Sequence, residues 1–143
     1  MERYVGYTGY PAAAETIDDL AASEGLADVN FVKIDVEGYE LEVLRGARRT
    51  LQAYEPTVFL EANHYCLNIF RRISLVDFTD EVLSIFPMVY AVDTSFEVLD
   101  LTERSSHPHF FHENVVSGRF PNLLCGFTPL IGERLAAMAS MGR

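Results

Sequence analysis

The segment that most constrains the fold is VNFVKIDVEG, at residues 29–38. Its first eight residues are almost continuously apolar, which is typical of a strand buried on both faces of a parallel sheet. Gly38 then marks a turn, and apolar residues recur at helical spacing from residue 39 to about 54. Pro56 ends that helix, and TVFLEAN at 57–63 predicts a second buried strand. Because a helix joins them, the two strands are expected to be parallel neighbours.

The remaining segments extend this unit to an α/β domain. The periodicity predicts helices at 17–24 and 76–86, a strand pair at 88–93 and 96–101, a loop at 102–121 and a last strand at 122–127. A chain of 143 residues has the usual size of one domain, so we expect a single domain over residues 1–143. The closing strands have no helices between them, which implies at least one antiparallel edge strand beside the parallel ones.

Local signals define the two ends of the first helix and a point of close packing in the second. Thr16, followed three residues later by Asp19, resembles a capping box, and Gly25 suits the left-handed residue that closes a helix. Gly46 lies inside the predicted second helix at a cost of about 1 kcal/mol relative to alanine. A glycine retained at such a cost indicates close packing at that position.

Charge and hydropathy exclude several kinds of partner. The chain has 11 basic and 21 acidic residues, and a net charge of -10 argues against nucleic acid or an anionic membrane as a partner. Its apolar runs are far shorter than the roughly 20 residues that span a bilayer, and the first residues show no signal peptide. Cys66 and Cys125 form no CxxC pair, so we interpret them as buried thiols. These features predict a cytoplasmic protein.

Polar residues gather where the two predicted strands end. They are Lys33, Asp35 and Glu37 in the first segment, and Glu61, Asn63 and His64 in the second. If the strands are parallel neighbours, both groups lie at the sheet edge where α/β proteins bind ligands. Carboxylates there could accept a proton from a substrate hydroxyl or hold a divalent cation. Alternatively Lys33, which is the chain's only lysine and lies in an apolar strand, forms a structural ion pair with Asp35 or Glu61.

Three other segments offer weaker candidates. The predicted loop contains His107, His109 and His112, but no cysteine or acidic residue stands at a standard zinc spacing, so we assign no metal ligand. Phe110, Phe111 and Phe120 either wall an acceptor pocket or pack in the core. The segment ERLAAMASM at 133–141 either docks on a partner or frays.

The same strand ends carry a family resemblance. TIDDL at 16–20, KIDVEGYELEVLRGA at 33–47 and LEAN at 60–63 together resemble the C-terminal half of the FkbM family of S-adenosylmethionine-dependent methyltransferases. The resemblance implies a Rossmann-like methyltransferase sheet with flanking helices. It also implies S-adenosyl-L-methionine as cofactor and methyl transfer to a hydroxyl of a small molecule or sugar.

The resemblance assigns roles to particular residues. It implies catalytic roles for Asp35 and Glu61, cofactor contacts for Asp35, Glu37 and Gly38, and substrate contacts for Asn63 and His64. Segments 29–36 and 57–63 would be the fourth and fifth strands of the methyltransferase sheet.

One part of the family pattern is missing from the sequence. No strand with a glycine-rich turn and no ribose-binding acidic residue precedes Thr16, and the glycine pair Gly6 and Gly9 is a weak substitute. We therefore expect a methyltransferase domain without its N-terminal cofactor-binding half, with the first strand at an exposed sheet edge. The competing hypothesis is a non-catalytic module that pairs with a second chain, such as a homodimer, through this edge.

Overall fold

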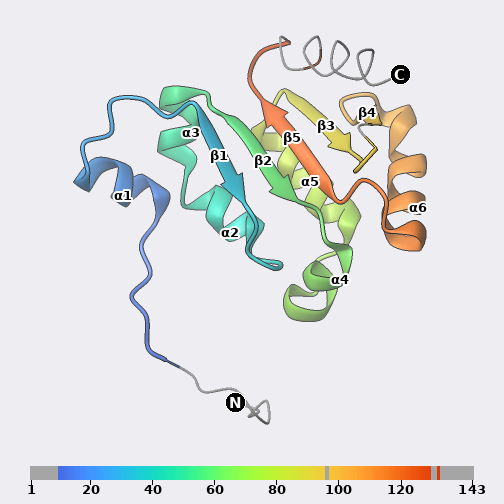
Figure 1. Cartoon of the computed structure of the whole chain (residues 1–143), viewed down its shortest axis with the longest axis horizontal. Helices are drawn as coiled ribbons and strands as arrows, with labels where there is room; N and C mark the ends of the chain where they lie inside the picture. The colour runs from blue at the N-terminus through green and yellow to red at the C-terminus, as the bar shows by residue number, and fades with distance from the viewer. Residues whose placement is uncertain (1–9, 96, 130–131, 133–143) are drawn as a thin grey trace.

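The computed structural model describes residues 10–95, 97–129 and 132. These residues form an α/β fold with one five-stranded mixed sheet, in the strand order β1-β2-β5-β3-β4 (Figure 1). The strands are β1 Phe31–Ile34, β2 Thr57–Glu61, β3 Met88–Val92, β4 Val98–Asp100 and β5 Asn122–Gly126. The helices are α1 Ile17–Ser23, α2 Glu40–Arg45, α3 Arg48–Tyr54, α4 His64–Cys66, α5 Leu75–Ile85 and α6 His107–Ser117. A π-helical turn, Leu67–Arg71, follows α4, and a 3-10 turn, Arg104–Ser106, precedes α6.

The strand pairing confirms the predicted mixture of directions. β1 and β2 are parallel, with Ile34 beside Leu60. β5 lies between β2 and β3 and is antiparallel to both, and β4 is the antiparallel edge strand beside β3. The helical connection makes β1 and β2 parallel, whereas the short turn after Val92 forces the antiparallel hairpin of β3 and β4.

One face of the sheet is covered by helices, and the core lies between them. α2, α3 and α5 pack on this face (Figure 1). The helices contribute Leu44, Leu51, Phe78 and Val82, and the strands contribute Val58, Leu60, Val89 and Leu123, all of which are fully buried. Alternate strand residues thus point inward, as a half-covered sheet requires.

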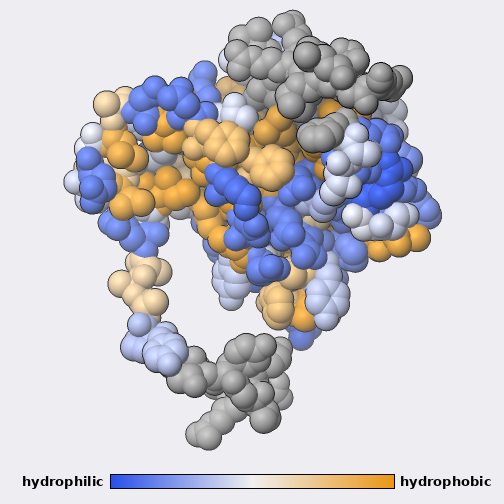
Figure 2. Space-filling model, in the orientation of Figure 1, coloured by the Kyte–Doolittle hydropathy of each residue, from blue (hydrophilic) through white to orange (hydrophobic). Residues whose placement is uncertain are grey.

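The other face of the sheet, toward the viewer in Figure 1, is not crossed by a described helix. Phe31 on β1 is therefore 58% exposed, while Ile34 is buried. Figure 2 shows hydrophobic and hydrophilic residues side by side on this face. Within the described part of the chain β1 also pairs only with β2. The predicted edge position of this strand is confirmed, but the prediction of a strand buried on both faces is wrong.

The predicted helix at 39–54 is two helices, because the chain breaks at Gly46 and Ala47. The Gly46 carbonyl accepts a hydrogen bond from the backbone N–H of Asp18 at 2.9 Å. A Cβ atom on Gly46 would lie 3.3 Å from two side-chain carbons of Thr16. The close packing inferred from this glycine is thus confirmed, and the contacting partner is the start of α1.

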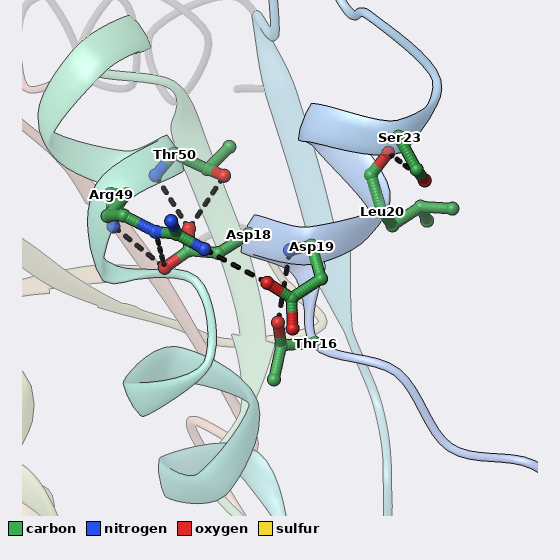
Figure 3. A network of polar contacts seen from close by, with 7 residues as sticks. All are labelled: Thr16, Asp18, Asp19, Leu20, Ser23, Arg49 and Thr50. Carbon is green, nitrogen blue, oxygen red and sulfur yellow. Dashed lines mark hydrogen bonds and ion pairs between the residues drawn. The ribbon is translucent and has the colours of Figure 1, made fainter.

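The ends of α1 agree with the capping signals. The Thr16 side chain accepts a hydrogen bond from the backbone N–H of Asp19 at 3.0 Å (Figure 3). Gly25 follows the helix with a φ of 61°, the left-handed conformation that favours glycine.

The predicted loop at 102–121 is wrong, because most of it is helix α6. Pro108 lies in the first turn of α6, and Gly118, with a φ of 65°, follows its end. Phe110 and Asn114, four residues apart, are both buried and attach the helix to the domain. The proline at the start and the glycine at the end were the available signals, but the polar and aromatic residues of this segment show little apolar periodicity.

Two predictions lie outside the described residues. These are the role of the segment 133–141 and that of the glycine pair Gly6 and Gly9. Among the residues that the structure does describe, no helix has the length and hydropathy needed to cross a membrane.

Candidate functional site

Three carboxylates converge at the carboxyl ends of β1 and β2. Asp35, Glu37 and Glu61 each offer an oxygen, and these oxygens all lie within 4.8 Å of one another. Asp35 and Glu37 follow β1 directly, and Glu61 is the last residue of β2. The parallel pairing of the two strands brings them together, so the predicted meeting of the two polar groups is confirmed for these residues. Figure 2 shows a hydrophilic strip over this part of the sheet.

The turn that follows β1 is fixed by hydrogen bonds to the buried side chain of Glu40, which sequence reasoning missed. Glu40 is 1% exposed, and its Oε1 accepts hydrogen bonds from the backbone N–H groups of Val36 and Gly38 at 3.3 and 3.2 Å. Glu37 and Gly38 both have positive φ values, 52° and 98°. A Cβ atom on Gly38 would lie 2.9 Å from the carbonyl oxygen of Cys66. Glycine is thus required here by packing against the protein's own backbone.

The crowding of negative charge changes the proton affinity of Glu61. Burial raises the pKa of Glu61, and the charges of Glu37, Asp35 and Glu40 raise it further, while the Asn63 side chain opposes these effects. Glu61 is therefore the carboxyl group of this cluster with the increased tendency to hold a proton.

Cys66 lies beside the cluster as a protonated thiol. Its Sγ donates a hydrogen bond to Glu37 Oε2 at 3.0 Å. Burial, followed by this hydrogen bond and the neighbouring negative charges, raises the pKa of Cys66 to about 11. Cys125 is fully buried, and burial also raises the pKa of that thiol. Both cysteines are free, as predicted, and neither is an activated nucleophile.

The site contains carboxylate oxygens that can accept further hydrogen bonds. Glu40 Oε2 and Glu61 Oε2 are buried, and neither has a hydrogen-bond partner among the described residues. An ionised carboxylate can only accept hydrogen bonds or coordinate a cation. The group therefore suits a ligand that is cationic or rich in N–H and O–H donors, or a hard divalent ion.

Lys33 and Asp35 form the ion pair that was considered as the structural alternative. Their side-chain atoms Nζ and Oδ2 are 2.6 Å apart, but the side chains are 57% and 48% exposed. The prediction that Lys33 is buried is wrong, because β1 is open on this face. An exposed ion pair of this kind contributes at most about 1 kcal/mol to the free energy of unfolding. The stability of the fold therefore depends little on Asp35.

The two residues predicted to contact substrate have partners within the protein. Asn63 caps α4, accepting a hydrogen bond from the backbone N–H of Cys66 at 3.3 Å. His64 places its Nδ1 atom 3.2 Å from Oδ1 of Asn114, on α6. Asn114 was not found from the sequence because it lies in the segment interpreted as a loop.

His107, His109 and the phenylalanines in and after α6 pack against other residues of the domain. His107 Nε2 contacts the carbonyl oxygen of Leu101 at 2.7 Å, and the His109 ring packs edge-on against Phe120. Within the described ranges, no group of residues that could hold a metal includes these histidines. Phe110 and Phe120 are fully buried, and Phe111 is partly buried against the core. Core packing is therefore the role of these three residues, and the acceptor-pocket interpretation is wrong.

A comparison with protein families agrees with this picture. The family model described as methyltransferase FkbM domain matches residues 2–100, more than half of the chain. The chain belongs to the FkbM methyltransferase family. The matched region contains all of the carboxylate cluster and ends before α6 and β5. Comparisons with curated proteins and with solved structures gave no match.

The family match extends the earlier resemblance in both directions. The motifs noted in the sequence cover residues 16–63, whereas the FkbM match also includes α5, β3 and β4. Asn114 lies beyond the matched residues.

Proposed function

We propose that this FkbM-family chain transfers a methyl group from S-adenosyl-L-methionine to a hydroxyl oxygen of a small molecule or sugar. The observation that carries the proposal is the convergence of Asp35, Glu37 and Glu61 at the carboxyl edge of a parallel strand pair. In Rossmann-like sheets this edge is where ligands bind. The helical connection of α2 and α3 between β1 and β2 supports the Rossmann-like assignment for this part of the sheet.

The residues at this edge fit the methyl donor. S-adenosyl-L-methionine carries a positive sulfonium and a positive ammonium group, and its ribose hydroxyls are donors. Asp35 and Glu37 are exposed carboxylates that would hold these groups, beside the backbone of Gly38. Glu61 has a buried oxygen with no hydrogen-bond partner among the described residues. When bound, the cofactor supplies an electrophilic methyl group.

Methyl transfer to oxygen requires mainly alignment of the two reactants. Asp35 and Glu61 are the proposed catalytic residues, because their negative charges orient a cationic donor next to the acceptor. Asn63 and His64 follow β2 at the same edge and are the proposed contacts for the acceptor.

A methyl-transfer assay tests the proposal. The chain is incubated with methyl-labelled S-adenosyl-L-methionine and a panel of monosaccharides and phenols, and labelled ether products are counted. We expect Asp35→Asn and Glu61→Gln to lower the rate by about 100-fold. Asp80→Asn, which changes an exposed carboxylate on α5, is the matched control and keeps the wild-type rate. Equal rates in all variants would refute the assigned roles.

A second candidate function is a non-catalytic module that forms a homodimer through β1. The observation that favours it is the edge position of β1, which pairs on one side only with β2 in the described part of the chain, while Phe31 on this strand is 58% exposed. Light scattering tests it: a dimer that becomes a monomer in Phe31→Lys supports edge pairing. Val116→Lys is the control, because Val116 is an equally apolar, 68% exposed residue on α6. A chain that is monomeric at high concentration would rule this candidate out.

A further inference from the structure

The amide of Asn114 has only one possible orientation. Asn114 is 3% exposed, and its Nδ2 atom donates hydrogen bonds to the carbonyl oxygens of Ala62 and Phe120, both at 3.0 Å. If the amide were flipped, its oxygen would face two carbonyl oxygens and none of the three could donate. Oδ1 of Asn114 is therefore the atom that faces His64.

This orientation decides which nitrogen of His64 carries the proton. Oδ1 of Asn114 can only accept, so His64 Nδ1, 3.2 Å away, must be the donor. A neutral imidazole has one N–H group, so its other nitrogen, Nε2, keeps a free lone pair. No described residue forms a hydrogen bond with Nε2, and the residue is partly exposed. His64 thus presents a proton acceptor to its surroundings.

His64 is placed where such an acceptor is useful. It begins α4, three residues after Glu61, at the end of β2 where the carboxylates converge. The carboxylates of the cluster and His64 could each take the proton of an acceptor hydroxyl. A cationic donor held by the carboxylates lowers their proton affinity, because a positive charge favours the ionised form. A neutral imidazole with a free lone pair on Nε2 can accept a proton from a hydroxyl group, and histidine is the side chain that most often does this in enzymes.

We infer that His64 removes the hydroxyl proton through Nε2 and that Asn114 is the positioning residue that sets its tautomer. This inference rests on the proposed methyl transfer. In the reaction the acceptor oxygen bonds to the methyl carbon as the bond from that carbon to the sulfonium sulfur breaks. The hydroxyl proton passes to Nε2, which leaves a methyl ether, a neutral thioether and an imidazolium that returns its proton to solvent.

Nitrogen NMR on the ¹⁵N-histidine-labelled chain tests the tautomer without any turnover. The spectrum is taken at about pH 8, above the ordinary imidazole pKa of about 6.5. His64 is assigned as the signal missing in His64→Asn. We expect Nδ1 to be protonated and Nε2 unprotonated, and Asn114→Leu to abolish this preference. A predominant Nε2–H tautomer in the wild-type chain overturns the inference, whether or not Asn114→Leu folds.

The methyl-transfer assay then tests the role of Nε2. Asparagine at position 64 can still donate to Asn114 in place of Nδ1, but it has no counterpart of Nε2. We expect His64→Asn to keep the wild-type melting temperature and to lose about 100-fold in rate. His112→Asn, at an exposed position of α6, is the matched control with an unchanged rate. A His64→Asn rate within about twofold of wild type would overturn the inference while leaving the proposed methyl transfer intact.

Discussion

Asp18 caps a helix that begins thirty residues later in the chain. Its Oδ1 accepts hydrogen bonds from the backbone N–H and from the hydroxyl of Thr50, both at 2.8 Å (Figure 3). Its Oδ2 accepts one from the backbone N–H of Arg49 at 3.0 Å. Ala47, the residue at the N-cap position of α3, has no side-chain acceptor. A residue of α1 therefore satisfies two N–H groups that α3 itself leaves free.

The first prediction is that Asp18→Ala destabilises the domain by about 1–2 kcal/mol, the usual cost of losing a helix cap. Urea unfolding of the two proteins measures the difference. Asp80→Ala, an exposed acidic position on α5, is the control and should change the free energy of unfolding by less than about 0.5 kcal/mol. Equal losses in both variants would show that Asp18 acts only through its charge.

The second prediction concerns acid stability and Asp93. A hydrogen bond from the backbone N–H of Ser95, together with those from Arg119 and Thr94, lowers the pKa of Asp93 to about 2, against the opposing effect of burial. Because the folded-state pKa is below the unfolded value, this stabilisation is complete above about pH 4 and is lost as the pH falls through 2. The shift corresponds to about 2 kcal/mol.

Thermal melts between about pH 2 and 5 test the role of Asp93. The wild-type chain should be more stable than Asp93→Asn at the upper end, and the gap should close by about 2 kcal/mol toward the lower end. Asp80→Asn should follow the wild-type curve. A constant gap across the range would contradict the assigned pKa.

The third prediction compares two glycines with positive φ. Gly25 has open space around its Cβ position, so Gly25→Ala should cost only the backbone strain of about 1–2 kcal/mol. At Gly38 the same change also drives a Cβ against the carbonyl of Cys66, which adds about 1–3 kcal/mol. Denaturant unfolding of the two variants gives the comparison, and an equal cost would refute the packing explanation.

The fourth prediction separates a structural from a functional role for Asp35. Since its ion pair with Lys33 is exposed, Lys33→Gln and Asp35→Asn should each change the free energy of unfolding by less than about 1 kcal/mol. Calorimetric melting measures both variants. A loss of about 3–5 kcal/mol in Asp35→Asn would indicate a buried ion pair and would contradict the exposed arrangement.

Local sequence patterns were sufficient for the elements that the chain specifies over short distances. The apolar runs predicted β1 and β2, and the helical segment between them predicted their parallel pairing. Thr16 and Gly25 defined the ends of α1. The convergence of Asp35 with Glu61 followed from that pairing, since parallel strands end at the same edge.

Other features depend on contacts between residues that are distant in the sequence. The same apolar sequence can form a central strand or an edge strand. The exposure of Phe31 and Lys33 therefore depended on which strands and helices lie beside β1. At the break between α2 and α3, Gly46 packs against Thr16, which is thirty residues earlier in the chain.

The sequence by itself determined the five strands, the helices α1 and α5, the family motifs and the pair of acidic strand ends. Only the tertiary structure decided that the Glu40 side chain accepts hydrogen bonds from the turn around Glu37 and that Asn114 faces His64. The physical reason is that a hydrogen bond depends on distance and direction between two atoms. For Asn114 and His64, which are 50 residues apart, these are set by the packing of α6 and not by any local pattern.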